Sequence, residues 1–422
     1  MQKRTKQILS WCLFDFANSS YSAVIAAVIF PVFYVSKIVG NEAGRGDLWW
    51  GRAISVSMAV VALTSPLLGG IADFSGRRKR LLLIYTLLSV SGVACFSLLS
   101  PGMALTGFLL IVIANVGMEG GLVFYNSFLP EIAPSGMQGR VSAWGFAVGY
   151  AGSILSLLIA LPLVRSGHFD LTWLMVAAFF LFFSVPAFLY LPPDRKAGLG
   201  ILRSSAQGAA YSWQTVREIW KERETRRFLA AFLIYEDGVN TVIVFSSVFA
   251  ATTLGFSSLE LIALYLVVQV TALAGAFVMA RPLDTAGPKK VLMLSLLLWT
   301  MVSVAAYFIE NKTSYFILAS VAGTGLGTVQ AAGRAFFTRF IPPGRESEYF
   351  GLYALVGKSS AIAGPLLFGY LSSTFHSQRP AILSISIFFG LGLLMIRGVN
   401  GGGPNVGTDR SSPVTDIRQE KA

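Results

Sequence analysis

Long apolar segments recur along nearly the whole chain, and short polar segments separate them. About 18 or more apolar residues cover the roughly 30 Å of hydrocarbon in a bilayer, because each helical residue rises by about 1.5 Å. The pattern therefore predicts an all-α membrane protein of twelve transmembrane helices. These lie near residues 10–37, 48–72, 81–100, 103–129, 141–164, 171–192, 228–252, 259–280, 290–309, 313–337, 348–374 and 380–396.

The composition excludes an ordinary soluble domain. Of the residues, 54% are hydrophobic and 13% are charged, whereas roughly 25% are charged in a typical soluble protein. The two cysteines, Cys12 and Cys95, each lie inside an apolar segment, so we predict no disulfide framework, no metal site and no cofactor. We expect the first apolar segment to be a span and not a cleaved signal peptide, because it is long and carries Asp15.

The net charge of +12 would suit a nucleic-acid partner, but the positions of the basic residues argue against one. Most of the 33 Lys and Arg residues flank the predicted helices on the side of the N-terminus, with clusters at 3–6, 77–80 and 195–227. In multi-spanning proteins such loops face the cytoplasm. We therefore expect a multi-pass protein of the cell membrane with both termini in the cytoplasm and no nucleic-acid partner.

A long polar interruption, residues 193–227, divides an N-terminal six-helix bundle, 1–192, from a C-terminal six-helix bundle, 228–396. Within it Ala209, Trp213, Val216 and Trp220 recur at helical spacing. This spacing indicates either an amphipathic helix on the membrane surface or a plain solvated linker helix. The tail, 397–422, has the composition of a disordered cytoplasmic segment.

Several local patterns occur once in each half. Asp15, Asn18 and Ser19 in the first predicted helix are matched by Asp237, Asn240 and Thr241 in the seventh. Pro130 and Pro342 end the fourth and tenth helices, and Gly149 is matched by Gly357. Duplication of a six-helix unit explains these matches, because membrane transporters are commonly built from such repeats.

The segment after the second predicted helix, Gly69-x-Ile-Ala-Asp73-x-x-Gly76-Arg77-Arg78, resembles the loop motif of the major facilitator superfamily. The resemblance implies two pseudo-symmetric six-helix halves that rock around a central path. Its glycines allow close packing and a tight turn, and its charges can latch one half against the other. The predicted gating loop comprises Gly69, Asp73, Gly76, Arg77 and Arg78, with Asp284 and Gly287 as partial counterparts in the second half. Phe74 departs from the arginine common in the motif.

Further segments resemble a narrower family. These are Trp11-Cys-Leu-Phe-Asp15-Phe-Ala-Asn18-Ser19, Asn126-Ser-Phe-Leu-Pro130-Glu131, Gly139-Arg-Val-Ser142, and Arg334-Ala-Phe-Phe-x-Arg-Phe-Ile-Pro342 followed by Glu348-Tyr-Phe-Gly351. Together they resemble the vacuole-effluxer-like family, whose fungal members are associated with autophagy and amino-acid export from the vacuole. The resemblance spans roughly residues 10 to 375 and implies that spans one, four, seven and ten line the path.

Ionisable residues inside the predicted spans are candidate functional groups, because each costs on the order of 3 kcal/mol in a membrane without a partner or a wet cavity. The predicted substrate or ion path comprises Asp15, Asn18, Glu119, Asn126, Glu236, Asp237, Asn240, Arg334 and Lys358.

Each of these groups has a structural alternative. We expect Asp15 and Asp237 to face the path, although an acid can also cap a helix start. Glu119 is the first candidate for proton coupling, and an ion pair with Arg334 or Lys358 is the alternative. Arg334 has the geometry to hold a carboxylate or phosphate group, with Lys358 as a weaker candidate because its span need not face the path.

The sequence thus predicts a secondary active transporter, coupled to a proton or another cation, that exports a small solute such as an amino acid and works as a monomer. A drug or lysolipid exporter, or a membrane scaffold or sensor that has lost transport, are the alternatives. Gly364-Pro365 resembles the kink of antiporter-type members but lies in the second half, so antiport stays open. An enzyme is disfavoured because no nucleophile and base or metal-ligand cluster is evident. No ATP-binding motif is present, so the energy must come from a proton or ion gradient or from the gradient of the substrate itself.

Overall fold

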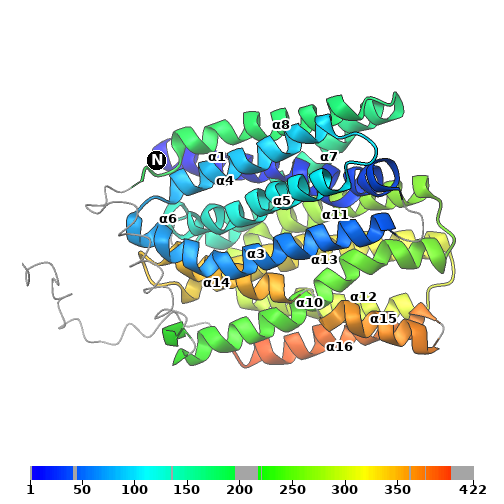
Figure 1. Ribbon diagram of the computed structural model, residues 1–422. Coiled ribbons are helices and arrows are strands. Elements are labelled where there is room, and N and C mark those ends of the chain that lie inside the picture. The colour runs from blue at the N-terminus through cyan, green and yellow to red at the C-terminus, as the bar shows by residue number, and fades with distance from the viewer. Residues whose placement is uncertain are drawn as a thin grey trace, which may run out of the picture.

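The computed structural model describes residues 2–40, 45–134, 136–194, 217–219, 221–360, 363–375 and 377–400. Every regular element within these ranges is a helix. The long helices run side by side across one bundle, with α8 and α4 at one edge and α16 at the other (Figure 1). The predicted all-helical fold is therefore confirmed.

The first half of the chain contains α1 (Gln2–Ser20), η1 (Tyr21–Val28), α2 (Phe30–Phe33), η2 (Tyr34–Val39), α3 (Arg45–Ser75), α4 (Arg78–Cys95), η4 (Phe96–Leu98), α5 (Ala104–Ser127), α6 (Leu129–Ile132), α7 (Gln138–Arg165) and α8 (Phe169–Tyr190). The first span bends by 43° between Val28 and Phe30. Pro31 lies in the first turn after this break, and a proline lacks the N–H that would continue the preceding helix.

The second half contains α10 (Arg223–Thr252), α11 (Ser258–Thr285), α12 (Pro288–Tyr307), α13 (Lys312–Phe337), η5 (Thr338–Phe340), α14 (Glu346–Ser359), α15 (Ala363–Phe375) and α16 (Gln378–Arg397). The residues of the predicted linker helix, Ala209, Trp213, Val216 and Trp220, lie outside the described residues, as does the tail from 401 onward.

Ten helices in the described residues are long and apolar enough to cross a membrane, and the bent first segment makes eleven. The predicted span near 348–374 is occupied by α14 and α15, which have 14 and 13 residues. Neither is long enough to cross alone, because about 20 helical residues are needed. Residues 361 and 362 between them lie outside the described residues, so this predicted span is not among the eleven candidates.

Two glycines make the tight turns that the repeated motif predicts. Gly76 has a φ of 66° between α3 and α4, and Gly287 has a φ of 90° between α11 and α12. A residue with a Cβ is strained in this left-handed region. The turns lie at the end of the bundle that carries the start of α1, here called the N-side; the opposite end is called the far side.

Buried apolar side chains form two clusters, one drawn from residues 11–191 and one from residues 219–399 with Ala143 of α7. Large apolar side chains also lie on the outer surface, where Leu63, Phe182 and Phe308 are each 70% or more exposed. An exposed apolar surface of this kind is suited to lipid contact. The chain thus has apolar cores inside and an apolar coat outside.

Candidate functional site

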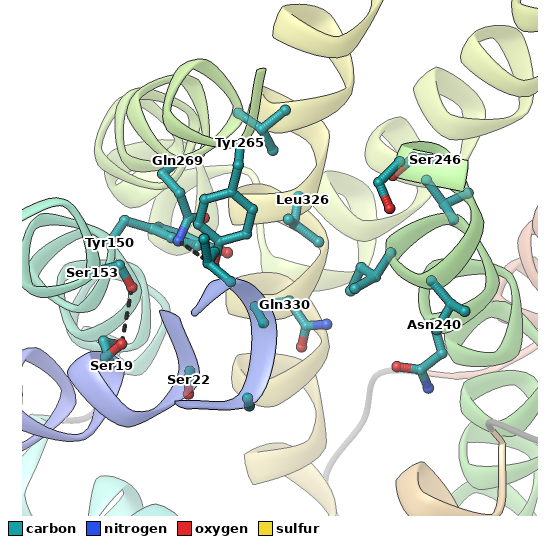
Figure 2. A pocket seen from close by; sticks show the side chains of 18 of the residues that line it. Ser19, Ser22, Tyr150, Ser153, Asn240, Ser246, Tyr265, Gln269, Leu326 and Gln330 are labelled. Atoms are coloured by element: carbon teal, nitrogen blue, oxygen red, sulfur yellow. Dashed lines mark hydrogen bonds between the residues drawn. The ribbon is translucent and has the colours of Figure 1, made fainter. Parts of the chain in front are cut away.

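A cavity of about 1440 Å³ lies between helices of both halves. Figure 2 shows Ser19, Tyr150 and Ser153 from the first half on one side, and Asn240 and Ser246 of α10 on the other. Gln330 of α13 and Gln269 of α11 also point toward this space. The predicted path residues that line the cavity are Asp15, Asn18, Glu119, Asn126, Glu236, Asn240, Arg334 and Lys358.

The cavity reaches the far side. Its lining includes Ser36, Lys37, Trp50, Val164 and Phe169, which lie at or near the far-side ends of their helices. Ser36 and Lys37 are exposed. Water therefore has access to the cavity from the far side.

Arg334 of α13 lies at the N-side end of the cavity and is held by the first half. Its Nε donates to Ser142 Oγ over 2.9 Å, one terminal nitrogen donates to the Ser142 carbonyl over 2.7 Å, and the other donates to Asn126 Oδ1 over 3.2 Å. The second of these nitrogens is 3.7 Å from Asp15 Oδ2. The guanidinium is thus satisfied almost entirely by groups of the other half.

Aromatic rings complete this enclosure. The Arg334 guanidinium carbon is 4.1 Å from the ring centre of Phe146 and 4.7 Å from that of Trp11. Trp11 stacks on Tyr125 and its indole N–H donates to the Tyr125 carbonyl over 2.9 Å. Aromatic faces attract a cation through their negative electrostatic potential. In this conformation the Arg334 donors are engaged by the protein itself, and its contact with a substrate carboxylate stays a prediction.

Glu119 and Lys358 form an ion pair between the halves. Glu119 Oε2 on α5 is 2.7 Å from Lys358 Nζ on α14. This contact matches one of the two roles that the sequence allows for Glu119. Lys358 also faces the cavity, although its span was expected to be a weaker candidate for the path.

Glu236 of α10 is a carboxylate in the same cavity with different surroundings. Its Oε1 accepts a hydrogen bond from Gln330 Nε2 over 3.1 Å. Within the described residues no Lys, Arg or His nitrogen lies within ion-pair distance of it. Asn240, one turn further along α10, donates to Ser360 Oγ over 3.1 Å.

Asp237 lies outside the cavity lining, which corrects the expectation that it faces the path. Both of its carboxylate oxygens accept from the Gly364 backbone N–H over 2.9 Å. Gly364 lies in the first turn of α15, and a carboxylate is stabilised at a helix N-terminus by the unpaired N–H groups there. Successive helical residues are rotated by about 100°, so Glu236 and Asn240 face the cavity while Asp237 turns toward α15.

The N-side is closed by contacts between α3 and α14. The backbone N–H of Glu348 donates to Asp73 Oδ2 over 2.9 Å. Arg78 pairs with Asp73 at 2.9 Å, with Glu131 at 3.4 Å, and with Glu346 of the other half. Figure 1 shows α3 and α14 alongside each other, which agrees with their extensive contact.

A second contact closes the N-side between α7 and α11. The backbone N–H of Arg140 donates to Asp284 Oδ1 over 3.0 Å, and Arg140 Nε lies 3.1 Å from Asp284 Oδ2. Asp73 and Asp284 are the matched acids of the repeated motif. We call these two contacts the N-side closure.

The glycines and the remaining arginine of the motif have separate places. A Cβ on Gly69 would collide with the backbone carbonyl of Ser347, so glycine lets α3 and α14 approach. Arg77 precedes α4 and takes part in no ion pair within the described residues. Sequence reasoning gave no role to Ser142, Gln330, Glu346, Glu348 or Arg140. Their partners lie in distant segments, so no local pattern indicates them. One signal was present: Arg140 and Glu348 are each the third residue of their helix, and these two helices, α7 and α14, occupy matching places in the two halves.

Comparisons with known proteins bear on the family and the fold. The family described as "Vacuole effluxer Atg22 like" matches residues 52–401. The chain is 29% identical to the "Uncharacterized MFS-type transporter YxiO" of Bacillus subtilis over 94% of this chain and 95% of the relative. It is 23% identical to "Autophagy-related protein 22" of Coccidioides immitis over 90% of this chain and 76% of that protein.

Solved structures show the same fold. The major facilitator superfamily transporter FucP in the outward conformation aligns with a TM-score of 0.73 at 13% identity, covering 93% of this chain and 98% of that chain. The human organic anion transporter MFSD10 aligns with a TM-score of 0.72 at 14% identity, with the same two coverages. At these identities the likeness establishes the twelve-helix fold and no substrate.

Proposed function

Because this chain belongs to the vacuole effluxer Atg22-like family of major facilitator superfamily transporters, we propose that it exports a small zwitterionic solute, such as an amino acid, by alternating access. It is a multi-pass membrane protein and not an enzyme. We propose that it works in the cell membrane as a monomer. Both termini are then in the cytoplasm, because the basic loops lie on the N-side. A proton or another cation is its driving ion.

One observation carries the proposal. A large cavity with charges of both signs lies between the halves; within the described residues, contacts between the halves close it on the N-side, and it reaches the far side. Alternating access requires a central site that one set of contacts seals at a time. Asp15 and Arg334 inside this cavity suit a solute that carries both charges, since they belong to different halves and each then meets an opposite group of the solute.

Arg334 supports export in particular. In this conformation Ser142, Asn126 and Asp15 occupy its donors. Separation of the halves on the N-side would remove these partners and leave the guanidinium free to hold a carboxylate, which it does in a bidentate manner. When the N-side closes again, the first half reclaims Arg334. The solute is then displaced toward the open far side.

The test is transport by purified protein in liposomes with a panel of radiolabelled amino acids. Matched compounds that lack the carboxylate or the amino group define the charge requirement. We expect exchange of at least one amino acid and none of its decarboxylated amine. As a control, Glu260→Gln removes an acid that pairs with Lys312 at the far side and lies outside the cavity lining; it should leave exchange unchanged.

A drug or lysolipid exporter is the second candidate, because the far-side part of the cavity is lined by apolar residues such as Val32, Leu158 and Leu161. Loss of activity after neutralising Arg334 does not separate the two, since Arg334 also joins the halves. The substrate panel does. Transport of lipophilic cations or lysolipids without any amino-acid exchange would contradict the amino-acid proposal and favour this second candidate.

A further inference from the structure

Three charged groups in the cavity form a cluster of two acids and one base. Glu119 comes from the first half, whereas Lys358 and Glu236 come from the second. Lys358 pairs with Glu119 at 2.7 Å, and Glu236 is bound by the uncharged amide of Gln330. Of the two acids, Glu119 is therefore paired with the cation of this cluster and Glu236 is not.

Lys358 is placed beside Glu236 by contacts on either side of it. Phe232, Glu236 and Asn240 are four residues apart, so they lie on one face of α10. A Cβ on Gly357 would be 3.2 Å from the Phe232 ring, and Ser360 accepts from Asn240. Lys358 lies between these two contacts in sequence. The backbone of Lys358 is therefore alongside the turn of α10 that carries Glu236.

Other groups around Glu236 are mostly neutral. Its own helix carries Asp237, which binds the N-terminus of α15. The described residues of α16 carry charge only near the helix ends, at Arg379 and Arg397, and those of α15 carry none. Other titratable or charged groups that line the same cavity include Asp15 of α1, Tyr150 of α7, Tyr265 of α11, Arg334 of α13 and Tyr353 of α14. Tyr235 of α10 lies outside the lining and interacts electrostatically with Glu236.

We propose that Glu236 carries the coupling proton, and that Lys358 discharges it by exchanging Glu119 for Glu236 as its partner when the halves separate on the N-side. This inference rests on the proposed function, because it assigns the driving ion and its site. The geometry favours Glu236 over Glu119 for this role, since Glu119 already has a cation.

The steps follow from which half each group belongs to. In this conformation the cavity reaches the far side, and a proton from water there binds the Glu236 oxygen that Gln330 does not hold. Opening of the N-side moves α14 away from α5 and breaks the pair of Lys358 with Glu119. The ammonium then turns to Glu236, whose proton leaves to water on the N-side. Each cycle moves one proton from the far side to the N-side.

The experiment measures two activities of the same liposomes, using the amino acid that the wild type exchanges fastest. Exchange at equal pH reports solute movement, and accumulation under a pH gradient, with trapped pyranine as the proton probe, reports coupling. We expect Glu236→Gln to retain exchange and to lose both gradient-driven accumulation and proton movement. Lys358→Gln should do the same, because nothing then discharges Glu236. The control Glu260→Gln should retain both activities.

Glu119→Gln gives an independent readout. Lys358 then pairs with Glu236 in both conformations, so the pH at which accumulation is half-maximal should move toward acid. Accumulation that stays proton-driven in Glu236→Gln overturns the inference. So does loss of exchange in a monodisperse Glu236→Gln protein, since Glu236 would then serve the solute; if that variant does not fold, Lys358→Gln decides. Absence of any wild-type exchange refutes the proposed function instead.

Discussion

The two contacts of the N-side closure are alike in their backbone and different in their charges. In each, an Asp near the end of one helix accepts from the backbone N–H of the third residue of a helix in the other half. Glu348 of α14 donates to Asp73, and Arg140 of α7 donates to Asp284. The N-terminus of a helix attracts a carboxylate because its first N–H groups have no partner within the helix.

The side chains at this third position have opposite charge. Arg140 pairs directly with the Asp284 that its own backbone binds. Glu348 instead turns to Arg345 at 3.0 Å, and Asp73 receives its cation from Arg78, which also reaches Glu346 across the halves. The duplicated fold has thus kept the backbone contact while its charge compensation differs: a pair on one side and a network on the other.

The network should hold the N-side more firmly than the pair, and Asp73→Ala should therefore have the largest effect. It removes the acceptor of the Glu348 N–H of the other half and the carboxylate that holds Arg78 toward Glu346 of that half, at a side chain that is 2% exposed. Breaking a buried ion pair costs about 3–5 kcal/mol. We expect the population to shift strongly toward an open N-side.

Distances between spin labels at Arg80 and Arg339 measure this shift, because both positions are exposed and lie on the N-side in different halves. The labelled protein has Cys12 and Cys95 replaced by alanine. Lys312→Gln, which breaks an ion pair at the far side, is the control and should leave the distances unchanged. An unchanged distribution in Asp73→Ala would show that the α3–α14 network does not hold the N-side.

The sequence predicts the acids of this closure and not what they meet. The repeated motif identifies Asp73, Arg78 and Asp284 as latching charges, because their spacing and their place after the second and eighth helices are local properties. Glu348 and Arg140 lie far away in the chain, and nothing local indicates that they oppose the motif. Their shared third position in matched helices is the signal that could have found them.

The cavity shows the same limit. Intramembrane charge predicts the set of candidates, because an unpartnered charge is costly in lipid. It does not choose between Glu236 and the adjacent Asp237, since that depends on how α10 is rotated and on where α15 begins. It also leaves the partner of Glu119 open, and the structure resolves this in favour of Lys358 over Arg334.

Asp284→Ala should have a smaller effect than Asp73→Ala. It removes one backbone hydrogen bond and one ion pair, and the Arg140 side chain is 29% exposed, so water can replace much of what is lost. Loss of such a partner costs about 1–3 kcal/mol. The same label distances should show a partial shift toward the open N-side. A shift as large as that of Asp73→Ala would mean that the extra partners of Arg78 add nothing.

Arg140→Gln should have the smallest effect, because the backbone of residue 140 still donates to Asp284. The variant loses only an ion pair whose base is partly exposed, and such pairs contribute up to about 1 kcal/mol. We expect label distances close to those of the parent protein. The difference between variant and parent should become smaller as salt is added to both, since salt screens the exposed ion pair that only the parent has. If Arg140→Gln opens the N-side as far as Asp284→Ala, the side-chain charge dominates this contact. The backbone N–H groups at the helix N-terminus would then not be the main source of stability common to the two contacts of the N-side closure.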